Sequence, residues 1–347
     1  MKQLHVKNHF VPESYLKRWG NIDNKIWVYR TLVSNKKVPL WKDYSASAIA
    51  YQKHLYTQII AGNESDELET WFDKNIESPA NKVLDRAVAD SRLSPKDWDI
   101  LIKFLAAQDV RTPARLFEHL QRTQQNLPEI LQNISNKLEK IKTKNDFDKL
   151  KTKEHITRKE RFPLKLTTEI EEGAENGLLK IETYTGRSTW IISIKHVLES
   201  TRKILHSHKW SIIKPAKGYY WPTSDNPVVK VNYYSPGNYD LKGGWGLKKG
   251  NIIFPLSPEH AMFVQIGDRP ILRGTRLSVS LTKEIIKFIV ENSHRKIFSH
   301  KDDISLTFLK ARTIDSKKLE RENNEIKLWH ESNSKLEREY FASNRVP

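Results

Sequence analysis

The stretch Trp221-Pro222-Thr223-Ser224-Asp225-Asn226-Pro227-Val228-Val229 sets a polar turn between two runs of strand-forming residues. Ile212, Ile213 and the aromatic residues before Pro222 favour a strand, and Val228, Val229 and Val231 resume the alternation typical of one. The turn therefore presents short polar side chains on a rigid rim between strands. Asp and Asn often bond to their own backbone in turns, and Pro fixes φ, so a purely structural turn remains open as the simpler interpretation.

The chain before this stretch is mainly helical in pattern. Apolar residues between Glu64 and Asp90 recur at helical spacing, and Pro79 is expected to kink or divide that helix. Ser94-Pro95-Lys96-Asp97 has the residues of an N-cap, a first-turn proline and a capping box, which predicts a helix that runs to about Val110. A short helix over residues 12–20 is expected to begin at Pro12. Two short strands, Lys25 to Arg30 and Lys36 to Leu40, are expected to form a hairpin.

The chain after Lys209 is mainly sheet in pattern. Asn251 to Leu256 and Ala261 to Ile266 are two apolar runs at hairpin separation, and Thr282 to Lys296 has the spacing of a further helix. We therefore predict an α+β fold, with a mainly helical N-terminal half packed on an antiparallel sheet from the C-terminal half. Residues 1–310 are expected to form one such domain, with a basic helical arm inserted at about 127–165. Residues 311–347 are expected to form a charged, solvent-facing helical tail.

Composition limits the classes of protein. The 347 residues, 38% of them hydrophobic and 10% aromatic, suffice for a folded core. The absence of Cys excludes disulfides, thiolate zinc sites and a Cys nucleophile. No apolar run approaches the length of a membrane span, and the first residues lack a signal-peptide pattern, so a cytoplasmic protein without membrane contact is expected.

The charge is strongly basic. Lys and Arg number 59 against 42 Asp and Glu, which gives a formal net charge of +17 and favours nucleic acid as a partner. A generally basic proteome would explain the same balance. The arm contributes the candidate phosphate-binding residues, although a solvated basic face explains these letters as well: Lys137, Lys140, Lys142, Lys144, Lys149 and Lys151. The charged tail is a candidate surface for a partner protein or for a second copy of the chain.

Three stretches together resemble a known family. They are His9-Phe10-Val11-Pro12 with Tyr15-Leu16, Gln108 with Arg111-Thr112-Pro113, and residues 223–227. With Leu55-Tyr56, the helix that carries Glu77, residues 254–258 and Asn292, they make the chain similar to members of domain-of-unknown-function family 4238 over roughly residues 7–300. The resemblance implies that these segments belong to one module. It implies no reaction or ligand.

If the three motifs meet in space, the site contains His9, Gln108, Arg111, Ser224, Asp225 and Asn226. Arg111 can bind a phosphoryl group, His9 can move a proton near neutral pH, and Asp225 can orient the imidazole or coordinate a metal. Asn226 and Gln108 can donate to a developing oxyanion. Helical spacing also allows Gln108, Arg111 and Arg115 to share an anion, although Arg115 fits a solvated basic face better.

Alternative roles for these residues stay open. Glu77 and Asp225 are possible ligands for Mg²⁺ or Mn²⁺, but two carboxylates are few for a metal-dependent nuclease, so no cofactor is the preferred expectation. Ser224 as a nucleophile with His9 as its base lacks the flanking glycines of that motif. A buried Arg111–Asp225 ion pair that ties the helical half to the sheet half would explain both residues without a substrate.

Two classes of function follow. The first is a phosphodiesterase that acts on RNA or DNA, as a toxin-like effector in defence against phage or plasmids. The second is a non-catalytic nucleic-acid-binding or assembly module, in which the polar motifs are structural and the arm binds.

Overall fold

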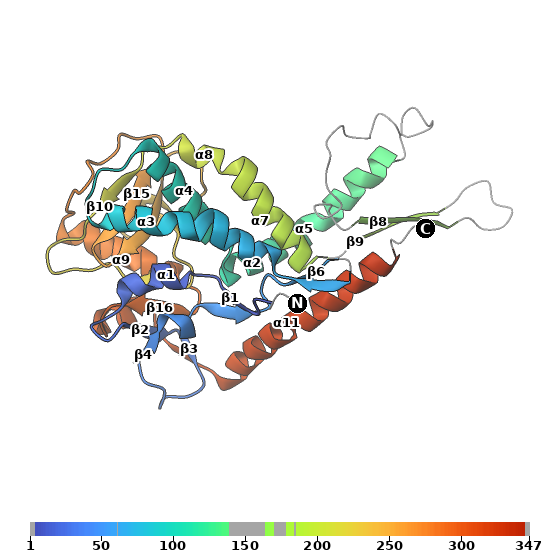
Figure 1. Cartoon of the computed structure of the whole chain (residues 1–347), viewed down its shortest axis with the longest axis horizontal. Helices are drawn as coiled ribbons and strands as arrows, with labels where there is room; N and C mark the ends of the chain where they lie inside the picture. The colour runs from blue at the N-terminus through green and yellow to red at the C-terminus, as the bar shows by residue number, and fades with distance from the viewer. Residues whose placement is uncertain (1–3, 61, 139–163, 170–177, 184, 344–347) are drawn as a thin grey trace.

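The computed structural model describes residues 4–60, 62–138, 164–169, 178–183 and 185–343. Within these residues the fold is α+β, with a helical N-terminal half packed on an antiparallel sheet from the C-terminal half, as predicted. Figure 1 shows helices α3 and α4 lying beside the sheet that contains β10 and β15, while the long helix α11 lies on the other side of the molecule, beneath β1 and β6. None of the helices in the described part of the chain combines the length and apolar character of a bilayer span.

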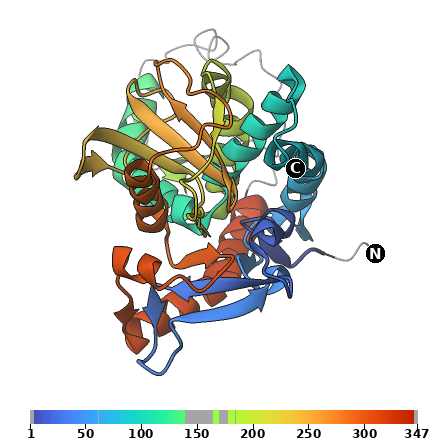
Figure 2. The same cartoon turned by 90° about the vertical axis from the view of Figure 1, so that its left-hand side faces the viewer.

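The larger sheet separates two hydrophobic cores. Its strand order is β10-β15-β14-β12-β13, and the ladders are antiparallel. Ile252, Phe254 and Leu256 of β14 pack with the helical half, whereas Ile253 packs against α9 (Val279–Asn292). Alternation along the strand sends neighbouring side chains to opposite faces, so a nearly continuous apolar strand is covered on both. Figure 2 shows this sheet between helices on either side. The strands are β10 (Ser211–Ile213), β12 (Val229–Ser235), β13 (Asn238–Asp240), β14 (Gly250–Ser257) and β15 (His260–Gln265).

The predicted hairpin of β14 and β15 is confirmed, but two other boundaries differ. Helix α9 ends at Asn292, before the expected Lys296, because residues 296–299 form strand β16. The strand that returns beside β2 is Trp41–Ser45 (β4), so the expected strand over residues 36–40 was wrong. Pro39 cannot donate a ladder hydrogen bond, and the return strand begins only after it.

The second sheet pairs strands from near the start of the chain with a strand close to residue 300. Its order is β11-β16-β2-β4, so strands near residues 25–45 pair with residues 296–299. β11 is the pair Thr223–Ser224 at the start of the polar turn. The turn therefore belongs to this sheet, while the strand after it enters the larger one. The strands are β2 (Lys25–Arg30), β4 (Trp41–Ser45), β11 (Thr223–Ser224) and β16 (Lys296–Ser299).

A long helical segment divides where Pro79 was expected to divide it. α2 (Glu67–Phe72) passes into a wide π-helical turn, Asp73–Glu77, and then into α3 (Ser78–Val88). Pro79 has no N–H for the preceding turn, which fits the change of helix type there. α4 (Pro95–Val110) begins with the predicted capping box: Asp97 N donates to Ser94 Oγ at 3.2 Å, and Ser94 N donates to Asp97 Oδ2 at 2.9 Å.

The arm is only partly described. α5 (Pro113–Leu138) carries Lys137, whereas Lys140, Lys142, Lys144, Lys149 and Lys151 lie outside the described residues. The end of the expected helical arm is a strand, because β8 (Leu164–Glu169) pairs with β9 (Leu178–Thr183). α7 (Arg187–His196), a second π-helical turn (Val197–Thr201) and α8 (Lys203–His206) then return toward the larger sheet.

The tail is a helix, as expected, but it is not solvent-facing throughout. α11 spans Ser316–Ser343, and near its C-terminal end Asn333, Ser334 and Glu337 are buried. These residues dock on α7 and on β6 (Gln58–Ile60). The remaining short elements are β1 (Lys7–His9), α1 (Glu13–Leu16), the 3₁₀ turns Lys17–Trp19 and Ala46–Ala48, β3 (Leu32–Val33), β5 (Tyr51–Lys53), β7 (Asn63–Ser65), α10 (Ile304–Leu309) and β17 (Thr313–Ile314).

Candidate functional site

The three sequence motifs meet at the C-terminal end of α4. The guanidinium of Arg111 donates through Nη2 to the backbone oxygen of His9, and Thr112 Oγ1 donates to Asn226 Oδ1 at 3.3 Å. Residues more than 100 positions apart are thus held around one helix end. The arrangement gives the motifs a common location, although the individual side chains face different partners.

Arg111 is the buried cation at the centre of this region. Its side chain is 0% exposed, its Nη1 lies 2.5 Å from Glu77 Oε1, and its guanidinium lies 4.3 Å from the centre of the Phe72 ring. Tyr56 Oη donates to the Arg111 backbone oxygen at 2.6 Å, which satisfies a carbonyl left free at the helix end. Burial alone would lower the pKa of Arg111, but the nearby Glu77, Tyr56 and Glu69 raise it. The expected Arg111–Asp225 ion pair was wrong, because the carboxylate that pairs with Arg111 is that of Glu77.

Several polar atoms near Arg111 are buried without a hydrogen-bond partner in the described chain. Gln108, one helical turn before Arg111 and 0% exposed, has none for either Oε1 or Nε2. Arg111 Nε, His9 Nε2 and Glu69 Oε2 share this condition. Buried polar groups usually have a partner, and exceptions often coincide with function. These four side chains therefore have donors and acceptors free for water or for a bound molecule.

Glu69 is the residue of this cluster that sequence reasoning missed. Burial raises its pKa to about 7; Glu77 adds to the rise, while the charge of Arg111 and a hydrogen bond from the His9 backbone oppose it. A carboxyl group that holds a proton near neutral pH can act as a general acid. The signal was present in the sequence, since Glu69 shares a helix face with the buried residues Phe72 and Ile76.

His9 is suited to act as a base. Burial lowers its pKa, the charges of Lys7 and Arg111 add to this effect, and Glu13 and a hydrogen bond with the Ser47 backbone oppose it. The ring is therefore neutral at neutral pH. Because Nε2 has no partner, the bond to Ser47 falls to Nδ1 and leaves Nε2 with the lone pair.

The carboxylate of Asp225 accepts hydrogen bonds from three backbone N–H groups. Its Oδ1 accepts from His294 N at 2.8 Å, and its Oδ2 accepts from Arg295 N at 2.7 Å and from Lys296 N at 2.9 Å. Three such bonds fix the turn onto the residues that lead into β16. The expectation that Asp225 orients the His9 imidazole therefore has no support in the geometry, and the structural interpretation fits this residue.

The side chains of Ser224 and Asn226 also form hydrogen bonds with backbone groups. Asn226 Nδ2 donates to Asn292 O at 3.0 Å, Asn292 Nδ2 donates to Asn226 O at 2.7 Å, and Asn226 N donates to Ser224 Oγ at 3.2 Å. These bonds join the turn to the end of α9. Within the described residues no contact brings Ser224 to His9.

The basic residues near α4 pair with two different carboxylates, Arg111 with Glu77 and both Arg115 and Lys230 with Asp109. Arg115 Nε donates to Asp109 Oδ1 at 2.9 Å, and Lys230 Nζ lies 2.7 Å from Asp109 Oδ2. Burial would raise the pKa of Asp109, but Arg115 and Lys230 lower it. The expectation that Gln108, Arg111 and Arg115 share an anion was therefore wrong.

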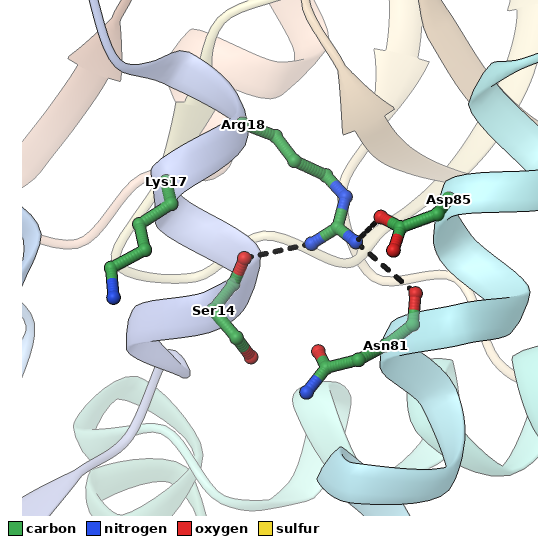
Figure 3. Close-up of a pocket in the computed structure, with 5 residues that line it drawn as sticks. All are labelled: Ser14, Lys17, Arg18, Asn81 and Asp85. Carbon is green, nitrogen blue, oxygen red and sulfur yellow. Dashed lines mark hydrogen bonds and ion pairs between the residues drawn. The ribbon is translucent and has the colours of Figure 1, made fainter. Parts of the chain in front are cut away.

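A surface pocket of about 310 Å³ lies between α1 and α3. Figure 3 shows its lining residues, with the guanidinium of Arg18 bonded to Ser14 O, to Asn81 O and to Asp85 Oδ1. Glu77 lies one turn before Asn81, and helical spacing puts Glu77, Asn81 and Asp85 on one face. Glu77 therefore shares a helix face with two lining residues of the pocket, although it does not line the pocket itself.

The possible metal ligands do not share a site. Glu77 faces Arg111, and the Asp225 oxygens accept backbone N–H groups. Among the described residues, the one group of three His and acidic side chains within 4.8 Å of each other is His54, Glu64 and His330. The rings of His54 and His330 are stacked at 3.9 Å, and Arg187 Nη1 lies 3.0 Å from His330 Nδ1. In this cluster His330 Nδ1 faces the Arg187 guanidinium and His330 Nε2 faces Glu64, so both ring nitrogens of His330 have hydrogen-bond partners within the protein.

Comparison with known proteins identifies the class of this chain. Residues 7–303 match the family model described as "Protein of unknown function (DUF4238)", which covers all three motifs and ends before α11. The chain belongs to this family. No curated protein and no solved structure matches the chain.

Proposed function

We propose that the protein is a phosphodiesterase that acts on RNA or DNA, with its centre at His9, Glu69, Gln108 and Arg111. The observation that carries this proposal is that two proton-transfer groups, linked by a hydrogen bond from the His9 backbone to Glu69, have pKa values shifted in opposite directions. His9 has a lowered pKa and a free lone pair, whereas Glu69 keeps its proton up to about pH 7. An acid and a base whose pKa values move in opposite directions are the arrangement that general acid–base hydrolysis requires.

Each residue has a role in the proposed reaction. His9 Nε2 removes a proton from the attacking oxygen, and the Glu69 carboxyl donates its proton to the leaving oxygen. The Arg111 cation stabilises negative charge that develops on the phosphoryl oxygens, and the free amide of Gln108 donates or accepts a further hydrogen bond. The net charge of +17 supports a polyanionic substrate. A toxin-like effector of defence against phage or plasmids remains the proposed setting.

The reaction would work best over a narrow pH range. Activity requires His9 to be neutral and Glu69 to be protonated, so it rises through the lowered pKa of His9 and falls as Glu69 ionises near pH 7. A bell-shaped profile below neutrality is the expected signature.

The test compares Glu69→Gln with Glu67→Gln, an exposed glutamate of the same helix. Purified proteins are incubated with end-labelled RNA and DNA, with and without Mg²⁺ or Mn²⁺, from about pH 5 to pH 8, and products are resolved on a denaturing gel. Cleavage by the wild type and by Glu67→Gln, but not by a folded Glu69→Gln, supports the proposal. Cleavage retained by Glu69→Gln overturns the assigned centre.

A non-catalytic nucleic-acid-binding module is the second candidate. Its support is that Ser224, Asp225 and Asn226 direct their hydrogen bonds to the backbone, as structural residues do. Under this alternative no variant cleaves, and salt-sensitive gel shifts are equal for Glu69→Gln and the wild type.

A further inference from the structure

α11 is attached to the rest of the protein at two polar anchors. Near its N-terminal half, Glu322 accepts two bonds from Arg295, at 2.9 Å and 2.7 Å. Near its C-terminal half, Glu337 pairs with Arg187. Between these anchors the residues from Asn323 to Leu328 are exposed. The helix therefore lies across the surface, held by these two ion pairs and by Trp329, which lies between them and packs against the hydrophobic core.

The C-terminal anchor is buried but polar. Both side chains of the Arg187–Glu337 pair are 0% exposed, with Arg187 Nη2 at 2.7 Å from Glu337 Oε2. Glu337 also accepts from Ile59 N at 2.8 Å, and the Asn333 side chain accepts from Arg187 N at 2.7 Å. Such bonds are exchanged for bonds to water when the helix leaves, so the net stability of the contact is small compared with its number of bonds. The polar bonds of this anchor therefore add little net stability, which suits a contact that opens and closes reversibly.

The imidazole rings of His54 and His330 stack on each other beside this anchor. His330 of α11 lies on His54 with ring centres 3.9 Å apart. Arg187 Nη1, which can only donate, lies 3.0 Å from His330 Nδ1, and His330 Nε2 lies 2.8 Å from Glu64 Oε1. A neutral His330 satisfies both contacts, with Nδ1 as acceptor and Nε2 as donor. A second proton on Nδ1 would set two donors against each other.

The charges around the histidines add to this conflict. His54 faces His330 from α11, Arg187 from α7 and its own neighbour Lys53, and Glu64 is the acidic group opposite them. Glu337 neutralises Arg187 within the same cluster. Among the described residues, His54 Nδ1 is buried without a hydrogen-bond partner. A proton added to His54 therefore meets three basic side chains and the carboxylate of Glu64.

We propose that His54 and His330 form a pH-sensitive lock that releases the C-terminal half of α11 from the body of the protein upon acidification. This inference is independent of the proposed phosphodiesterase activity. The released helix leaves residues 54–59, whose Tyr56 reaches the end of α4, without the cover that Glu337 and His330 supply.

The direction of the pH dependence follows from His54. Burial lowers its pKa below the ordinary 6.5, with His330, Arg187 and Lys53 adding to the effect and Glu64 opposing it. The docked state therefore binds fewer protons than the released state. Docking is fully stable above about pH 6.5 and weakens as the pH falls below it.

The test uses the absence of Cys in the chain to place two spin labels. Glu339→Cys on α11 and Lys82→Cys on α3 both lie at exposed positions of the described structure. The distribution of distances between the labels is measured by pulsed electron spin resonance at about pH 7.5 and pH 5.5. We expect a narrow distribution at the higher pH and a broad, longer one at the lower pH. An unchanged distribution overturns the proposal.

Histidine variants identify the responsible groups. The double variant His54→Gln, His330→Gln is expected to keep the narrow distribution at both pH values, and a single variant serves if the double variant is already released at about pH 7.5. His196→Gln, at an exposed position on α7, is the matched control and should respond as the wild type does. Release of the histidine variants with the wild-type midpoint would assign the effect to another group and refute the lock.

Discussion

Replacement of Gln108 by Met is expected to stabilise the protein. Gln108 is 0% exposed, and neither of its amide atoms has a partner within the described chain. An amide buried without a hydrogen bond costs about 1–3 kcal/mol in proteins, and Met has a similar length without that group. The free energy of unfolding should therefore rise by about 1–3 kcal/mol.

The corresponding change in melting temperature is small but measurable. An unfolding entropy of about 2.1 cal/mol/K per residue gives about 0.7 kcal/mol/K for 347 residues. The melting temperature should rise by about 1–4 °C, as measured by scanning calorimetry and checked by urea denaturation. Under the proposed function, the same variant should lose cleavage, so stability and activity should change in opposite directions.

Asn226→Leu is the matched control because both amide atoms of Asn226 have partners. It should lower the free energy of unfolding, with the opposite sign to Gln108→Met. A Gln108→Met variant that is no more stable than the wild type would refute the reasoning, since the amide would then be satisfied in the folded protein.

Three further predictions concern stability. Arg111→Met should lower the free energy of unfolding by about 3–5 kcal/mol in urea titrations, because it leaves Glu77 without its cation, and adding Glu77→Gln should restore part of the loss. Asp225→Ala removes the acceptor of three backbone N–H groups at about 1–3 kcal/mol each, so a loss below about 1 kcal/mol in thermal melts would contradict the structural role assigned to it. The pKa of Glu69 in the folded protein, about 7, exceeds its ordinary 4.5. The proton on Glu69 therefore stabilises the folded state fully below about pH 4.5, and this stabilisation is lost as the pH rises through 7. Glu69→Gln should therefore exceed the wild type in stability by about 3 kcal/mol at about pH 8, and the difference should vanish near pH 4.5, as urea titrations at both pH values would show.

Local features of the fold were predictable from the sequence. The capping box of Ser94 and Asp97 and the hairpin of β14 and β15 depend on residues close together in the chain, where spacing and turn chemistry decide the structure. The pairing of β2 with β16 joins residues about 270 apart, and no local pattern specifies it. The helix α11 was predictable from its charge-rich composition, but the burial of Glu337 was not, because its partner Arg187 lies 150 residues away.

The candidate site was predictable only in part. The motifs around His9, Arg111 and Asn226 do meet, as their resemblance to one family suggested. Asp225 was assigned to chemistry because its residue type allows it, whereas its actual partners are backbone groups that a sequence cannot display. Glu69 was overlooked because an acidic residue in the first turn of a helix is also what the helix dipole favours.

The wide turn at Asp73–Glu77 has a consequence for where the two glutamates point. Residues eight apart in a regular α-helix, such as Glu69 and Glu77, lie about 80° apart around the axis. A π-helical turn absorbs one extra residue, worth about 100°, so the two carboxyl groups come to within about 20° of the same line. The π-helical geometry of the turn, and not only the residue types, thus brings both toward Arg111. A regular α-helix over the same residues would leave the two carboxyl groups about 80° apart while the composition of the site stayed unchanged.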